Sequence, residues 1–279
     1  MKDATRAVRA ARPGPDARFV NPPVYHASTV LFDGMEGLRA SRAQEKGEGV
    51  TYGVHGTPGT YALETAIAEL EGGFRTRLCS TGASALAGPL IAFLSAGDHL
   101  LVPDSCYGNT RELSNGMLAR LGIAVEYYDP LIGGGIRDHL RPETKVVFTE
   151  SPGSQTFEVQ DIPAIAEEAH RAGAIVMMDN TWASPLYFKA FEHGVDVSIQ
   201  AVTKYVAGHS DLVMGAVTST EAAYPRIREG WKELGLSGSP DDTFLAMRGL
   251  RSLPARMPMH WANGLRLGAW LADRPEVAE

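Results

Sequence analysis

Two reactive side chains in this sequence, a lysine and an aspartate, each follow an apolar run. Lys204 lies in residues 196–211, after such a run and before a Gly-His-Ser-Asp turn. A lysine forms a Schiff base with a carbonyl compound when a sheltered position keeps its amine neutral. The neighbouring Thr203 offers a hydroxyl that suits a phosphate oxygen. On this pattern alone, a surface lysine at the end of a strand is the alternative.

Asp179 ends the apolar run of residues 174–178. A carboxylate at a buried strand end costs free energy unless it is paired, and ligand sites of open α/β sheets gather at the carboxyl ends of strands. An acid there suits the ring nitrogen of pyridoxal 5'-phosphate (PLP), because the protonated ring is the better electron sink. Lys204 follows 25 residues later (204 − 179), which leaves room for both at neighbouring strand ends. An aspartate that caps a loop or helix is the alternative.

Small residues between an expected strand and an expected helix form a third candidate site. Gly82 and Ala83 would open that helix, and the free amides of a helix N-terminus bind phosphate. The segment is neither a GK[ST] phosphate loop nor a GxGxxG fingerprint, so a tightly packed turn is the alternative. Tyr107, after the next expected strand, is placed to stack on a flat cofactor ring, and a tyrosine that only packs is the alternative. Tyr52 carries an equally weak signal.

Other chemistries and partners find less support. The eight histidines show no HExxH or paired spacing for a metal, and no GxSxG motif is present. A net charge of −7 offers no basic face for nucleic acid, and no apolar run approaches the roughly 20 residues that cross a bilayer. The basic N-terminus lacks the apolar core of a signal peptide, and two cysteines make no disulfide framework. We expect a cytoplasmic protein without metal, nucleic acid or membrane.

The elements that must position these residues alternate between helices and strands from residue 60 onward. Several strands are near-continuous apolar runs, as strands covered on both faces are. This order predicts an α/β fold with a largely parallel sheet. Strands are expected at 76–80, 99–102, 123–127, 145–149, 174–178, 195–200 and 212–218, and helices at 60–71, 82–94, 110–120, 162–171, 241–251 and 261–273.

In combination, these segments resemble the trans-sulfuration family of PLP-dependent enzymes of Cys/Met metabolism. The amino-acid sequence of residues 129–133, 148–161 and 198–205 is most similar to the cystathionine β-lyase branch of this family. Each piece is weak alone, and the identification depends on their order and spacing over nearly the whole chain. The matching segments are NPPVYHASTVLF, YGxxGT, ALExxIAELEGG, STGASA, LVPDSCYGNT, ESPGS, MMDNTWASP and SIQAVTKYVAGHSD.

The resemblance implies a PLP-dependent transferase fold of type I, with a mixed, mostly parallel seven-stranded sheet in the large domain. Lys204 would hold PLP as a Schiff base, Asp179 would pair the ring nitrogen and Tyr107 would stack on the ring. The Gly82 and Ala83 amides would hold the phosphate together with the Thr203 hydroxyl.

Tyr52 would reach into the site of a neighbouring subunit, so a homodimer or homotetramer is expected. The implied reaction is β-cleavage of L-cystathionine, a small sulfur amino acid, to homocysteine, pyruvate and ammonia in methionine biosynthesis. Lys204 or a tyrosine would take the α-proton, and Lys204 would protonate the leaving thiolate. Sister activities are the first alternative: γ-lyase, γ-synthase or O-acylhomoserine sulfhydrylase. A PLP-binding fragment without catalysis is the second.

Two features depart from the family pattern. The arginine that usually follows the tyrosine by two residues, and binds the phosphate in the facing subunit, is replaced by Val54, with His55 next. A charged hydrogen bond contributes roughly 1.5–3 kcal/mol, so the loss should weaken PLP binding about tenfold or more unless His55 or a nearby arginine substitutes. The chain also ends at Glu279, so the small C-terminal domain, with the arginine that grips the substrate carboxylate, is expected to be largely absent.

These considerations divide the chain into three parts. Residues 1–55 are expected to form an extended N-terminal arm, since proline fixes φ and lacks a donor. Residues 56–252 form the PLP-binding large domain, and residues 253–279 begin the linker helix to the C-terminal domain, with an exposed apolar face. The prolines of the arm are Pro13, Pro15, Pro22 and Pro23.

Overall fold

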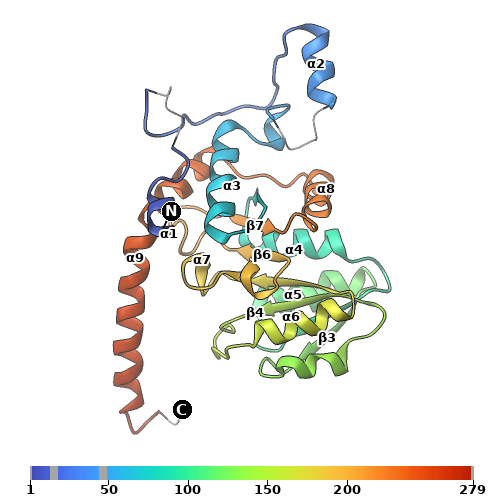
Figure 1. The fold of residues 1–279 in the computed structure, drawn as a ribbon, viewed down its shortest axis with the longest axis vertical. Coiled ribbons are helices and arrows are strands. Elements are labelled where there is room, and N and C mark those ends of the chain that lie inside the picture. The colour runs from blue at the N-terminus through green and yellow to red at the C-terminus, as the bar shows by residue number, and fades with distance from the viewer. Residues whose placement is uncertain (1, 13–17, 44–48, 278–279) are drawn as a thin grey trace.

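The structure, a computed structural model, describes residues 2–12, 18–43 and 49–277. At its centre is a seven-stranded sheet of order β1-β7-β6-β5-β4-β2-β3 (Figure 1). β7 runs antiparallel to β1 and β6, and all pairs from β6 to β3 are parallel. The expected mixed, mostly parallel seven-stranded sheet is therefore confirmed. The strands are β1 (Arg75–Cys79), β2 (His99–Pro103), β3 (Ala124–Tyr128), β4 (Thr144–Glu150), β5 (Ile175–Asp179), β6 (Val197–Gln200) and β7 (Gly215–Ser219).

Helices cover both faces of the sheet, which explains why its strands are apolar. Phe148 and Met177 share a buried cluster with α4 (Gly82–Phe93) and α8 (Tyr224–Leu234). Their neighbours along the strands point to the other face, in a cluster with α6 (Ile162–Arg171). Each fully buried aliphatic or aromatic side chain of these clusters contributes about 1.5–3 kcal/mol. The sheet is thus a rigid platform, and its strand ends are fixed positions for side chains.

A third cluster joins α3 (Pro58–Glu71) and the long helix α9 (Pro240–Ala272) against β1 and β7. α3 begins after Thr57, whose hydroxyl accepts a hydrogen bond from the Thr60 amide, and it ends at Gly72 with φ 80°. The remaining elements are α1 (Asp3–Val8), α2 (Gly34–Ala43), α5 (Gly108–Leu113), α7 (Ser184–Tyr187), the 3₁₀ helices Gly53–His55, Gly133–His139 and Ala190–His193, and a π-helical turn at Ser114–Leu118.

The structure differs from expectation at both ends of the chain. Residues 1–55 were expected to form an extended arm, but α1 and α2 lie there, and Ala7 of α1 is buried. Of the prolines of the arm, Pro13 and Pro15 lie outside the described residues. The two helices expected at 241–251 and 261–273 are one, because the buried Leu253 and Met257 continue the packing of α9 across Pro254 and Pro258.

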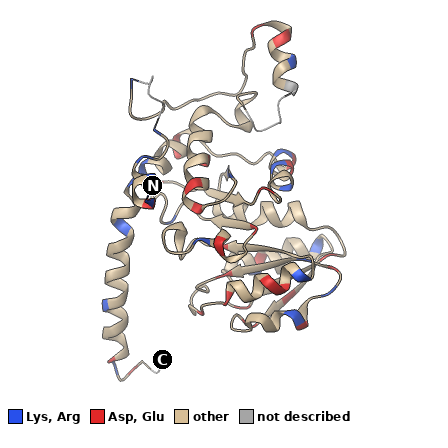
Figure 2. Ribbon diagram, in the orientation of Figure 1, with Lys and Arg blue, Asp and Glu red and all other residues tan. Residues whose placement is uncertain are grey.

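The last part of α9 extends away from the rest of the molecule (Figure 1). Its residues from 258 onward are exposed, and the large apolar ones include Trp261, Leu265 and Trp270, with 54%, 65% and 52% exposure. Figure 2 shows few charged residues along this helix. The division into arm, large domain and linker helix stays a prediction.

Candidate active site

Four of the residues singled out in the sequence line one cavity of about 610 Å³: Tyr107, Asp179, Thr203 and Lys204. The volume falls in the range of about 300–1,000 Å³ that is usual for small-molecule sites. The cavity lies at the carboxyl ends of β4 and β5, beside the turn that follows β6. This is where an open α/β sheet is expected to bind a ligand.

Asp179 is the last residue of β5, and its Oδ1 accepts a hydrogen bond of 3.0 Å from the Thr181 amide. Burial raises the pKa of the Asp179 carboxyl, and the hydrogen bonds from Thr181 oppose that rise. No hydrogen bond from a cationic side chain reaches this carboxylate within the described residues. A protonated ring nitrogen would supply the missing positive partner, so the site fits PLP.

Glu150, which the sequence analysis did not single out, is the direct neighbour of Asp179 in the pairing of β4 with β5. Its Oε2 accepts a hydrogen bond of 2.7 Å from the backbone amide of Tyr107. Burial, with the negative charge of Asp179 as a second cause, raises the pKa of Glu150 to about 8. Glu150 therefore connects Asp179, which is expected to pair with the ring nitrogen, to Tyr107, which is expected to stack on the ring. Its position at the end of an apolar run was the signal available in the sequence.

The turn that carries Lys204 is held by backbone hydrogen bonds. The Lys204 amide donates to the Ala201 carbonyl at 2.9 Å, and the Lys204 carbonyl accepts from the Gly208 amide at 2.8 Å. The Lys204 residue is exposed in this chain, so the sheltered position expected for it is not found. Lys204 shares the cavity wall with the strand ends Glu150 and Asp179, which are less exposed than the lysine.

Thr203 uses its hydroxyl within the chain. The Thr203 hydroxyl donates to the Met214 carbonyl at 3.1 Å and accepts from the Met214 amide at 3.0 Å. A hydroxyl has one proton, so this group would have to rotate before it could donate to a phosphate oxygen.

Gly82 and Ala83 open α4, as expected, with Thr81 as the N-cap that accepts from the Ser84 amide at 2.9 Å. A Cβ on Gly82 would lie 3.1 Å from the Cβ of Ala201, so this helix start lies against the segment that leads to Lys204. Neither residue is among those that line the cavity. In the described part of the chain no partner is recorded for their two amides, which suits an anion.

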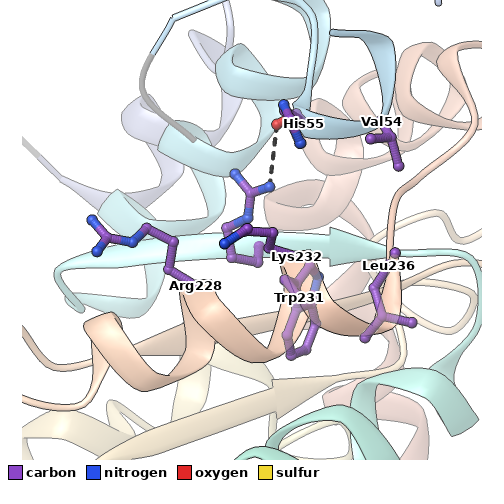
Figure 3. Close-up of a pocket in the computed structure, with 8 residues that line it drawn as sticks. Val54, His55, Arg228, Trp231, Lys232 and Leu236 are labelled. Atoms are coloured by element: carbon purple, nitrogen blue, oxygen red, sulfur yellow. Dashed lines mark hydrogen bonds between the residues drawn. The ribbon is translucent and has the colours of Figure 1, made fainter. Parts of the chain in front are cut away.

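Tyr52 does not line this cavity. It is 46% exposed and packs edge-on against His55, with ring centroids 6.1 Å apart. The neighbouring Val54 and His55 line a separate pit of about 20 Å³, which is room for about one water molecule (Figure 3). There Arg77 donates to the His55 carbonyl at 3.2 Å, and the side chains of Arg228 and Lys232 are close by (Figure 3).

Further cavity residues were not apparent from the sequence. Arg256 and His260 reach the cavity from α9. Phe157 and Trp182, both about half exposed at 54% and 51%, form an edge-to-face pair with ring centroids 5.9 Å apart. Phe157 has a left-handed φ of 63°, an uncommon conformation that occurs at functional loops.

Other kinds of site are not found among the described residues. They contain no group of three or more His, Cys, Asp or Glu side chains arranged to hold a metal. None of their helices is both long and apolar enough to cross a bilayer. Cys79 and Cys106 are free and buried, and burial raises the pKa of the two thiols to about 12 and about 11.

The fold and this arrangement of lysine, acids and tyrosine define a PLP-dependent enzyme of fold type I. The chain belongs to the family of Cys/Met metabolism PLP-dependent enzymes, whose model matches residues 4–279. A relative from Rhizobium johnstonii, provisionally named a cystathionine beta-lyase, is 50% identical over 260 residues, 93% of this chain and 64% of its own length. Cystathionine beta-lyase MetC of Escherichia coli is 40% identical over 262 residues, 93% of this chain and 66% of its own length.

Solved structures agree with this assignment. Cystathionine gamma synthase from Xanthomonas oryzae, in complex with aminoacrylate and cysteine, matches with a TM-score of 0.91 at 33% identity, over 100% of this chain and 70% of its own. This chain therefore spans about two thirds of the length of its relatives. The names of these relatives differ in reaction, so the comparisons support a PLP-dependent lyase or transferase rather than one activity.

Proposed function

We propose that this chain is the cofactor-binding part of a carbon–sulfur β-lyase that cleaves L-cystathionine, with one water, to homocysteine, pyruvate and ammonia. The observation that carries the proposal is the meeting of Lys204, Asp179 and Tyr107 in one cavity at the carboxyl edge of the sheet. The β-lyase names of the relatives from Rhizobium johnstonii and Escherichia coli favour this reaction within the family.

The residues of the chain have separate tasks in this proposal. PLP, when bound, supplies the electron sink that makes the α-proton of an amino acid removable. Lys204 would hold the cofactor covalently until the amino group of the substrate displaces it. The freed lysine amine would then take the α-proton and give a proton to the leaving sulfur. Asp179 keeps the ring nitrogen protonated, and Tyr107 packs its ring on the cofactor.

The phosphate would bind at the start of α4. The amides of Gly82 and Ala83, which have no partner in the described part of the chain, and the positive end of the helix dipole favour an anion. Thr203 would add a hydroxyl after rotation away from Met214, to which it is now hydrogen-bonded. Arg77, Arg228 and Lys232 beside Val54 place positive charge near the position where the family has its phosphate-binding arginine.

We also propose that the active unit is a homodimer, assembled further into a homotetramer, and that it works in the cytoplasm. Tyr52 lies outside the cavity of its own chain, which supports a role in the site of a facing subunit. The N-terminal arm exposes large apolar side chains, Phe19 at 76% and Leu31 at 91%. Such side chains are typical of an interface.

A γ-type reaction on the same scaffold is the second candidate. The likeness to cystathionine gamma synthase from Xanthomonas oryzae favours it. A substrate panel separates the two, with pyruvate and 2-oxobutyrate measured individually. Pyruvate from cystathionine supports β-cleavage, and 2-oxobutyrate would show that the bond at the γ-carbon breaks instead.

The cofactor assignment is tested first, on the purified chain with added PLP. We expect a yellow absorbance band that borohydride removes, and a reduced label that peptide mass mapping places on Lys204. A label on another lysine, or no reducible band on folded protein, would overturn the assignment. A reducible band on Lys204 without turnover on any sulfur amino acid would indicate a PLP-binding fragment without catalysis.

A further inference from the structure

The turn that carries Lys204 is held from outside by one side chain of α9. The guanidinium of Arg256 donates from Nη2 to the carbonyls of Tyr205 at 2.7 Å, Val206 at 3.5 Å and Gly249 at 3.0 Å. Two of these carbonyls directly follow Lys204 in the chain. Arg256 also lines the cavity that contains Lys204.

The guanidinium itself is held in place. Nε of Arg256 donates to the Ser252 hydroxyl at 2.9 Å, and that hydroxyl donates to the Gly249 carbonyl at 2.8 Å. Gly249, Ser252 and Arg256 are spaced three and four residues apart, so they share one face of the helix. Burial lowers the pKa of Arg256, yet the charge is balanced by carbonyl oxygens rather than by a carboxylate.

Two glycines allow this close contact. A Cβ on Gly249 would lie 2.2 Å from the Ala207 carbonyl oxygen and 2.4 Å from that of Val206, so the backbone of α9 touches the turn directly. Gly208 has φ +75°, and a Cβ there would lie 2.4 Å from the Cζ of Arg256. The Lys204 turn and α9 are therefore in close contact, with a glycine on each side, Gly208 in the turn and Gly249 in the helix, that leaves no room for a side chain.

We propose that Arg256 is a positioning residue for Lys204, which it serves by fixing the carbonyls of the two following residues. The inference rests on the proposed function, in which Lys204 binds the cofactor. A turn with free carbonyls at Tyr205 and Val206 could rotate its peptide planes, and the lysine amine would then spend less time directed at the cavity. Hydrogen bonds from a charged donor are strong enough to suppress such motion about tenfold or more.

The test uses the full chain and compares Arg256→Met with Arg248→Met. Arg248 is an exposed arginine of the same helix, and among the described residues it makes no hydrogen bond to the Lys204 turn. Hydrogen exchange of the Ala207 and Gly208 amides, which bond to the Val202 and Lys204 carbonyls, reports opening of the turn. We expect about tenfold faster exchange in Arg256→Met and no change in Arg248→Met.

A second readout follows the lysine. The rate at which borohydride-trapped PLP accumulates on Lys204 should fall about tenfold in Arg256→Met. Hydrogen exchange of amides far from the Lys204 turn should stay unchanged, which shows that the rest of the chain remains folded. Ser252→Ala, which removes only the partner of Nε, should give a smaller change of the same kind, and it serves if Arg256→Met does not fold. Unchanged exchange and unchanged labelling in a folded Arg256→Met, or in Ser252→Ala where that variant serves, would overturn the proposal. If the wild type carries no label on Lys204, the proposed function fails, and the exchange measurement still shows whether Arg256 holds the turn.

Discussion

The carboxylate of Glu150 accepts a hydrogen bond from the backbone amide of Tyr107 at 2.7 Å. The same residue is paired across the sheet with Asp179. Glu150 thus fixes the start of α5, where the tyrosine proposed to stack on the cofactor lies, relative to the strand end that would face the ring nitrogen. Tyr107 and Asp179, which are far apart in the sequence, are therefore held at a defined separation by Glu150.

Replacing Glu150 by alanine should therefore weaken PLP binding about tenfold, because the Tyr107 amide loses its acceptor at a partly buried position. Glu150→Gln keeps an acceptor oxygen of the same shape and should retain most of the affinity. Titration of each variant with PLP, followed by absorbance, measures this. Glu143→Ala, an exposed change before the other end of β4, is the control. Equal affinities for the alanine and glutamine variants would contradict the role of the hydrogen bond.

Lys204→Ala should abolish the reducible link to PLP, since Lys204 is the only lysine among the described residues that line the cavity. Mass mapping after borohydride reduction measures it, with Lys145→Ala, an exposed lysine of β4, as the control. If Lys204→Ala kept the yellow band and its reducibility, the lysine would be wrongly assigned.

Asp179→Asn should weaken PLP and slow removal of the α-proton about 10- to 100-fold. The amide still accepts from Thr181, so the local backbone is kept, but it cannot hold a positive charge on the ring nitrogen. Exchange of the substrate α-proton with deuterated solvent, followed by NMR, isolates that step from later ones. An exchange rate equal to that of the wild type would exclude Asp179 as the partner of the ring nitrogen.

The sequence predicted the elements of the sheet well, because several strands, such as β2 and β5, are short apolar runs between polar segments. β1 is the exception, since its sequence RTRLC is mostly polar. α6 matches its expected bounds, Ile162–Arg171, since Asp161 caps it and Gly173 with φ +79° follows its end. α8 was not expected, although its buried residues Tyr224, Ile227 and Trp231 have helical spacing. Charged residues between them concealed the pattern.

The candidate site could be predicted only in part. Lys204, Asp179 and Tyr107 each follow a strand expected from the sequence, and the carboxyl ends of parallel strands meet at one edge, so their proximity could be expected. Glu150 could not be connected to Asp179, because that contact depends on which strands are neighbours and in what register. Arg256 is 52 residues from Lys204 (256 − 204), and its role depends on how α9 crosses the turn.

A buried acid away from the cavity gives a prediction for stability. Glu71, the last residue of α3, is fully buried, and its Oε2 accepts a hydrogen bond of 3.0 Å from Ser198, while Oε1 has no partner among the described residues. Burial raises the pKa of Glu71 from 4.5 to about 7. Between these two values the unfolded chain is ionised and the folded chain keeps its proton.

The folded state then binds more protons, so the free energy of unfolding falls as the pH rises from about 4.5 to about 7. The protonated Glu71 contributes fully to the free energy of unfolding below pH 4.5. Between pH 4.5 and about 7 this contribution falls by on the order of 3 kcal/mol. Glu64 has the same direction, with a pKa also raised to about 7 by burial. Glu71→Gln should remove about half of the combined slope, and urea unfolding at pH 4.5, 5.5, 6.5 and 7.5 measures it. Glu69→Gln, an exposed change on the same helix, should leave the slope intact, and an unaltered slope in Glu71→Gln would mean that Glu71 is ionised in the folded protein.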